Sequence, residues 1–192
     1  MKKILIIITI FFSTISTIGA EEIKRIVVGN KDAKITIIAF ESLTCSHCAN
    51  FHKDVYPELK KDYLDTGLAK IEFRHFPLDI AAFNASKVSQ CNNDGDSKIL
   101  NSFYANQQKW VKGSSVQEAN ENLKKFLVSE GYNVDFEKCI NDKEIEDFVL
   151  NDRIDAVKKY KISSTPTIII NDEKFEKTLN YKNLKKALEK LI

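Results

Sequence analysis

The sequence has almost no excess of charge of either sign. It contains 29 lysine and arginine residues against 27 aspartate and glutamate residues. The first twenty residues hold two of the lysines and no acidic residue, so the rest of the chain carries 27 of each sign. A nucleic-acid-binding domain normally shows a basic stripe or patch. The composition therefore gives no support for a nucleic acid as a partner.

Long hydrophobic runs are also missing, with one exception at the start. A short basic beginning is followed by an apolar run over residues 4–12 and by small or hydroxylated residues up to Ala20. This three-part pattern is typical of a secretory signal peptide. The apolar run is too short to span a bilayer comfortably, which disfavours an uncleaved anchor. We expect residues 1–20 to be a signal peptide and the mature protein to be exported to the periplasm.

Internal repeats and low-complexity linkers are absent too. Strand patterns cover residues 24–28, 34–40, 69–76, 165–171 and 174–176, and helical patterns cover 45–65, 80–91, 97–110, 117–130, 134–141, 143–160 and 181–191. Pro57 predicts a kink in the first helix near Tyr56. The helical block lies between strands that belong to one sheet. We therefore predict an α/β fold with its first part at 21–79, an inserted all-helical domain at 80–160 and its second part at 161–192.

The chain has only four cysteines and a single Cys-x-x-Cys motif, Cys45-Ser46-His47-Cys48. A zinc site with four cysteines usually needs two such pairs. The motif follows an apolar strand and opens a helix, where unpaired backbone N–H groups and the helix dipole favour a thiolate. Cysteines in such positions have pKa values of roughly 3.5–7.5. A zinc site and an inert structural disulfide remain as alternatives, but no metal or cofactor is expected.

The positions within the motif predict different roles for its residues. Cys45 should be the exposed, reactive thiolate, and Cys48, one turn into the helix, should be the buried resolving thiol. His47 can hydrogen-bond to Cys45 or place a positive charge near it, which stabilises the reduced form and makes the disulfide more oxidising. The alternative for His47 is an exposed histidine without a role. We interpret His52 as a helix-surface residue rather than a ligand.

A second signal is the segment Ser164-Thr165-Pro166-Thr167, which opens an apolar strand. Proline is poorly tolerated inside a central strand, and a cis peptide bond before Pro166 would resolve the conflict. The backbone of Thr165 would then be free to bind an extended substrate by strand addition. Taken alone, Pro166 is more often an ordinary strand-edge proline, but the Cys45–Cys48 motif upstream in a β-α-β order favours the cis form.

These motifs together resemble the DsbA-like disulfide oxidoreductases, which are exported enzymes with a thioredoxin fold and an inserted helical domain. The matching segments are residues 40–48 (FESLTCSHC), 73–79 (FRHFPLD), 103–110 (FYANQQKW) and 164–167 (STPT). The resemblance implies that Cys45 and Cys48 are the redox pair, that His47 tunes Cys45, and that Pro166 is a cis-proline facing it. Ser46 departs from the family, which commonly has proline there.

The resemblance carries two further expectations. Many members have an acidic residue at the position of Ala39, and Glu41, which should point the same way from the strand, is a candidate substitute. The family also has a branch with a second disulfide in the helical domain, which implies a bridge between Cys91 and Cys139. The alternative for these two cysteines is a pair of buried free thiols.

The function that the resemblance implies is that of a monomeric thiol:disulfide oxidase. It would transfer the Cys45–Cys48 disulfide to reduced or unfolded secreted proteins, and a DsbB-like membrane oxidase would reoxidise it. The alternatives are a disulfide isomerase or reductase that uses the same residues, and a thioredoxin-fold chaperone that binds peptides without redox turnover.

Overall fold

A five-stranded sheet organises the part of the chain that the structure describes. The computed structural model describes residues 22–192, so the predicted signal peptide at 1–20 lies outside the described residues. The strands are β1 (Ile26–Gly29), β2 (Ile35–Glu41), β3 (Ala69–His75), β4 (Thr167–Ile170) and β5 (Glu173–Lys174). Their order across the sheet is β1-β3-β2-β4-β5. The predicted strands are therefore all present, with boundaries shifted by at most two residues.

The central strand β2 is apolar enough to be covered on both faces. It pairs with β3 in parallel, from Ile35 opposite Ala69 to Glu41 opposite His75, and with β4 in antiparallel register. A parallel pair needs a crossover connection. That connection is the helical segment that begins at the Cys-x-x-Cys motif, which places the motif at the carboxyl end of β2.

The helices agree closely with the sequence pattern. They are α1 (Ser46–Asp54), α2 (Tyr56–Leu59), a π-helical turn (Lys60–Leu64), α3 (Ile80–Gln90), α4 (Lys98–Ala105), α5 (Gln107–Trp110), α6 (Val116–Ser129), α7 (Phe136–Asn141), α8 (Lys143–Tyr160) and α9 (Tyr181–Leu188). The break at Val55 between α1 and α2 lies two residues before Pro57, because proline is accepted in the first turn of a helix but not in its interior. The predicted kink is confirmed.

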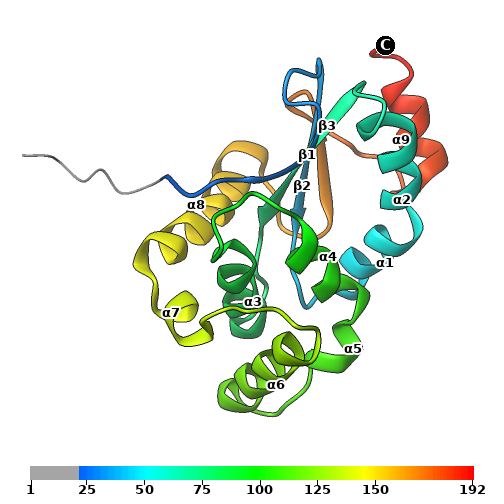
Figure 1. Ribbon diagram of the computed structural model, residues 1–192. Helices are drawn as coiled ribbons and strands as arrows, with labels where there is room; N and C mark the ends of the chain where they lie inside the picture. Colours follow the sequence, from blue (N-terminus) through cyan, green and yellow to red (C-terminus); the bar gives the residue numbers. More distant parts are fainter. Residues whose placement is uncertain (1–21) are drawn as a thin grey trace, which may run out of the picture.

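Helices α3 to α8 lie between β3 and β4 in the chain, as a helical insertion between two strands of one sheet requires (Figure 1). The carboxyl-terminal half of α8 also covers the sheet. A small apolar cluster joins its Ala156 and the following Ile162 to Phe40 of β2 and Ile169 of β4. The predicted thioredoxin fold with helical insertion is confirmed. Helix α8 belongs to the insertion and also packs on the sheet.

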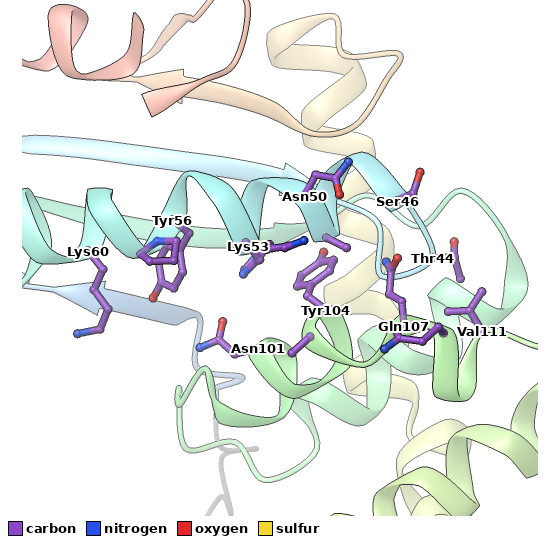
Figure 2. A pocket seen from close by; sticks show the side chains of 15 residues that line it. Thr44, Ser46, Asn50, Lys53, Tyr56, Lys60, Asn101, Tyr104, Gln107 and Val111 are labelled. Atoms are coloured by element: carbon purple, nitrogen blue, oxygen red, sulfur yellow. The ribbon is translucent and has the colours of Figure 1, made fainter. Parts of the chain in front are cut away.

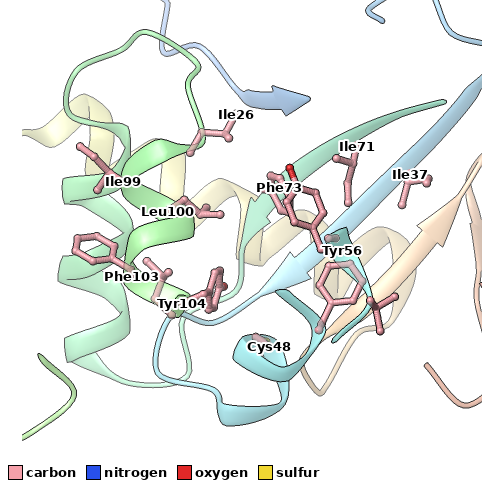
Figure 3. Close-up of a cluster of buried hydrophobic side chains, with 14 of the residues drawn as sticks. Ile26, Ile37, Cys48, Tyr56, Ile71, Phe73, Ile99, Leu100, Phe103 and Tyr104 are labelled. Carbon is pink, nitrogen blue, oxygen red and sulfur yellow. The ribbon is translucent and has the colours of Figure 1, made fainter. Parts of the chain in front are cut away.

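On the other face, a single larger core runs from the sheet into the insertion. It includes Ile37 and Phe73 of the sheet, Cys48 of α1, and Phe103 and Tyr104 of α4 (Figure 3). Because α1 and α4 share this core, the insertion is fixed against the helix that carries the motif. Within the described residues, no helix is both long and apolar enough to cross a membrane.

Candidate active site

The two cysteines of the motif have different environments, as the sequence predicts. A tight turn after β2, in which the N–H of Cys45 donates to the carbonyl of Ser42 at 3.0 Å, delivers Cys45 to the N-cap position of α1. Cys45 is partly exposed, whereas Cys48 is 0% exposed within the first turn. Both are free thiols in this structure. The geometry therefore separates an accessible sulfur from a buried one.

Local hydrogen bonds lower the pKa of the Cys45 thiol from 9.0 to about 5. The largest contribution is the hydrogen bond from the Cys48 side chain, and the Thr165 hydroxyl and the backbone N–H groups of Cys48 and His47 add to it, against partial burial, which acts to raise the pKa. The pKa of Cys48 is instead raised, chiefly by burial. At neutral pH, Cys45 is therefore a thiolate and Cys48 a thiol.

The loop before β4 lies opposite Cys45. Because β4 runs antiparallel to β2, with Thr167 opposite Phe40, its first residue lies at the carboxyl end of β2. The Thr165–Pro166 peptide bond is cis, as predicted. The sulfur of Cys45 lies 3.5 Å from the carbonyl oxygen of Thr165. The Thr165 hydroxyl is buried, and it acts to lower the pKa of the Cys45 thiol.

The side chain of His47 is exposed at the same place. It lines a cavity of about 500 Å³ together with Thr165, Pro166 and Tyr181. The contribution of His47 to the low pKa of Cys45 comes from its backbone N–H. The structure thus places His47 beside the reactive sulfur and at the wall of a groove.

Sequence analysis misjudged His52. Its side chain is only 6% exposed, so the interpretation as a helix-surface residue is wrong. His52 Nε2 lies 2.8 Å from Oε2 of the buried Glu41, and its ring stacks on Tyr104 at a centroid distance of 4.0 Å. Helix α4 of the insertion covers this face of α1 and buries it. The pattern of residues 45–65 alone does not reveal this burial, because α4 lies elsewhere in the sequence.

Glu41 is close enough to both cysteines to affect them. It is 3% exposed, and burial raises its pKa while the neighbouring His52 opposes this rise. Its negative charge contributes to the raised pKa of Cys48. The expectation that Glu41 brings an acidic group to the site in place of Ala39 thus agrees with this geometry.

Gln107 is a further site residue that sequence analysis did not single out. Its Nε2 donates to the carbonyl oxygen of Leu43 at 2.7 Å and to that of Cys45 at 3.0 Å. These bonds tie α5 of the insertion to the turn that carries the motif. The signal was available, since Gln107 lies in the 103–110 segment that resembles the family.

The remaining two cysteines are bonded to each other. Cys91, at the end of α3, and Cys139, in α7, form a disulfide with Cα atoms 5.4 Å apart. Both belong to the insertion, and both pack in the larger hydrophobic core. In residues 22–192, no group of three or more histidine, cysteine or acidic side chains is placed to hold a metal ion.

A half-exposed thiolate over a buried thiol at a helix start, opposite a cis-proline on this sheet, defines a DsbA-like protein of the thioredoxin fold. A family model described as thioredoxin matches residues 21–190, and the chain belongs to that family.

Solved and curated relatives agree with this assignment. The crystal structure of alpha-DsbA1 from Wolbachia pipientis is 29% identical, covers 87% of this chain and 90% of its own, and superposes with a TM-score of 0.76. Disulfide bond formation protein D of Bacillus subtilis is 26% identical over 181 residues, which cover 85% of this chain and 75% of that relative. The names of these relatives support a thiol:disulfide oxidoreductase.

Relatives from Rickettsia are longer. A candidate protein-disulfide oxidoreductase from Rickettsia bellii is 28% identical over 170 residues, which cover 86% of this chain and 64% of the relative. For the corresponding proteins of Rickettsia prowazekii and Rickettsia conorii, the matched share is 61% and 52%. The chain thus spans between about half and two thirds of the length of these relatives.

Proposed function

We propose that this protein is an exported thiol:disulfide oxidase that transfers the Cys45–Cys48 disulfide to the cysteines of newly secreted proteins. The observation that carries the proposal is the contrast between the two sulfurs. Hydrogen bonds favour the thiolate of Cys45, with a pKa of about 5, while burial keeps Cys48 protonated. Stabilising the reduced form makes the corresponding disulfide a stronger oxidant.

The proposed reaction starts from the oxidised protein. A client thiolate attacks Cys45 Sγ, a client–Cys45 bond forms, and the Cys45–Cys48 bond breaks. Cys48 leaves as a thiolate and takes up a proton, because its buried site disfavours charge. A second client thiolate then attacks the client sulfur of the mixed disulfide, and Cys45 leaves as a stable thiolate. The client dithiol is oxidised to a disulfide, and the protein is reduced.

Thr165 and Pro166 are proposed to hold the client next to Cys45. The carbonyl of Thr165 lies at the reactive sulfur, and an extended chain could bond to this backbone by strand addition. Exposed His47 lines the same groove and is proposed to contact the client there. The roles of these residues rest on their positions around one sulfur.

Location and partners are part of the proposal. The signal-peptide pattern of residues 1–20 supports export to the periplasm, where disulfides persist. A DsbB-like membrane oxidase would restore the disulfide, and the protein would act as a monomer without a cofactor.

Two measurements on the mature chain test the proposal. The first is the equilibrium constant of the Cys45–Cys48 pair with glutathione, expected to lie on the oxidising side. The second is the rate at which the oxidised protein restores activity to reduced, unfolded ribonuclease, compared with its rate on scrambled ribonuclease. A reducing equilibrium constant, or activity on the scrambled form alone, would assign a reductase or isomerase instead.

A further inference from the structure

A second and larger cavity lies on another side of the reactive sulfur. It measures about 1020 Å³ and is formed between α1 and α2 on one side and α4 and α5 on the other (Figure 2). Thr44 and Ser46, the two neighbours of Cys45, stand at one end of it. This volume is at the upper end of the roughly 300–1,000 Å³ of small-molecule sites, so it has room for several side chains.

The two cavities are adjacent around the same helix. From α1, residues 46, 49, 50, 52 and 53 line the large cavity, and residues 47, 50, 51 and 54 line the smaller groove beside Pro166. Each set contains residues three or four positions apart, so each cavity lies along its own side of the helix. Asn50 belongs to both. Cys45 caps this helix and so stands between the two cavities.

A polypeptide bonded to Cys45 has two arms, one on each side of its cysteine. One arm can lie along Thr165 in the smaller groove. The other arm must leave the sulfur in another direction, and the large cavity begins at Ser46 and Thr44. The chemistry of its lining then determines which side chains that arm should carry.

The lining combines apolar and basic side chains. Ala49, Tyr104 and Val111 supply apolar and aromatic surface. Lys53 and Lys60 also line it, and no aspartate or glutamate of the described chain does. Lys60 is paired with Asp65 at 2.5 Å, whereas Lys53 has no such ion pair within residues 22–192. An apolar group followed by a carboxylate would match this arrangement.

A buried polar atom at the same cavity lacks a partner. The side chain of His52 is 94% buried and lines the cavity, and its Nδ1 has no hydrogen-bond partner among the described residues. Asn101, on the facing helix, also lines the cavity. Buried polar atoms are normally hydrogen-bonded. The unpartnered Nδ1 makes the His52 ring a polar element of this wall of the cavity.

We propose that the cavity between α1 and α4 is a second client subsite, which binds the arm of the polypeptide that does not lie along Thr165 and prefers an apolar residue next to an acidic one. This inference deepens the proposed function and rests on it. It assigns to the helical insertion a part in choosing clients, because one wall of the subsite comes from α4 and α5.

The test uses cysteine peptides and the oxidised, mature protein. One peptide carries Phe-Glu on the amino-terminal side of its cysteine, one carries it on the carboxyl-terminal side, and a third carries Gly-Gly on both sides. The rate constant for release of Cys48 thiol on mixing should be about five- to tenfold higher for one of the two Phe-Glu peptides than for the Gly-Gly peptide, as expected for an ion pair with buried apolar contact. Only one of the two Phe-Glu peptides should react faster. In the other peptide, Phe-Glu is on the arm that lies in the groove at Thr165, outside the large cavity.

Three variants locate the effect. Ala105→Trp fills the cavity from an exposed position on α4 and should remove the advantage of the Phe-Glu peptide. Lys53→Glu should remove it too, and should transfer the preference to a Phe-Lys peptide. Lys125→Glu, an equally exposed change on α6 outside the cavity, should leave the preference unchanged. All three should react with the Gly-Gly peptide and with glutathione as the unchanged protein does.

The outcomes separate the subsite from the underlying activity. If neither the peptides nor glutathione react with the oxidised protein, the proposed oxidase function is wrong. If all peptides react alike, or if Ala105→Trp keeps the preference, the subsite is wrong and the oxidase stands. Titration with dodecanoate gives a further check: saturable binding that Lys53→Glu abolishes, without any peptide preference, would assign the cavity to a fatty acid and overturn the proposal.

Discussion

Oε2 of Glu41 and Nε2 of His52 form a buried pair 2.8 Å apart, directly beside the redox site. Glu41 ends β2 and His52 lies in α1, so the pair links the central strand to the helix that carries the cysteines. Tyr104 of the insertion covers the imidazole, and the pKa of the Tyr104 hydroxyl is raised, first by burial and then by the charge of Glu41. Three parts of the fold therefore meet at one ionisable contact.

Removing one member of this pair should cost more than removing both. His52→Phe leaves the Glu41 carboxyl buried without its partner, and we expect the free energy of unfolding to fall by about 3 kcal/mol. Glu41→Leu combined with His52→Phe should recover most of that loss. Urea unfolding of the oxidised protein measures both values. With Glu41→Leu measured alone as well, a loss in the double variant equal to the sum of the two single losses would show that the two side chains do not interact.

The reactivity of the two thiols should differ strongly with pH. At about pH 6 an alkylating reagent should modify Cys45 and spare Cys48, because only the former has its pKa lowered to about 5. Peptide mass mapping identifies the modified residue. Cys45→Ser should abolish oxidation of a reduced client, and Cys48→Ser should accumulate mixed disulfides since nothing resolves them. Retained turnover in Cys45→Ser would exclude the proposed mechanism.

Stability of the reduced protein should depend on pH in a way that the oxidised protein lacks. Between about pH 5 and about 8.5, the folded chain holds Cys45 as a thiolate while the unfolded chain holds a thiol, so the unfolded state binds more protons. Stability then rises with pH and is lost as the pH falls through 5. Above about 8.5 it should fall again, because the pKa of folded Cys48 is raised. Denaturant titrations of both redox forms across this range measure the difference; identical profiles would contradict the low pKa.

Replacing the His47 side chain should have a limited effect on the Cys45 pKa. The backbone N–H groups, the Cys48 thiol and the Thr165 hydroxyl stay in place in His47→Leu. The Cys45 pKa should therefore remain well below the ~8.5 of a free thiol. The thiolate absorbance near 240 nm, followed with pH, measures it. A return to the free-thiol value would mean that the imidazole itself stabilises the thiolate, as the sequence alone first indicated.

Much of this architecture is readable from the sequence because each signal is local. The apolar run 34–40, the alternation of 69–76 and the helix start at Cys45 each specify their element by period and capping position. The separation between an exposed and a buried sulfur follows from their places in one helical turn.

The contacts that bury the residues around the site join segments that are far apart in the sequence. His52 reads as polar on a helix, and its burial depends on Tyr104, which is 52 positions away in the insertion. The hydrogen bond from Gln107 to the turn at Cys45 spans a similar distance along the chain. A periodic pattern reports which face of a helix is apolar, but it does not report which other element covers a polar position.

The disulfide between Cys91 and Cys139 should stabilise the insertion without taking part in the chemistry. It joins the end of α3 to α7 across 48 positions, and the chain-entropy model assigns about 4 kcal/mol to a loop of that length. Cys91→Ser with Cys139→Ser should lower the melting temperature accordingly. Alkylation of Cys45 at acidic pH should persist, since the hydrogen bonds that lower its pKa come from Cys48, Thr165 and the start of α1.

Mass mapping of the unchanged protein should find the Cys91 and Cys139 peptides linked to each other and to neither active-site cysteine. Two free thiols in protein purified under oxidising conditions would contradict the bridge, and loss of Cys45 reactivity in the double variant would show that the insertion controls the site through it.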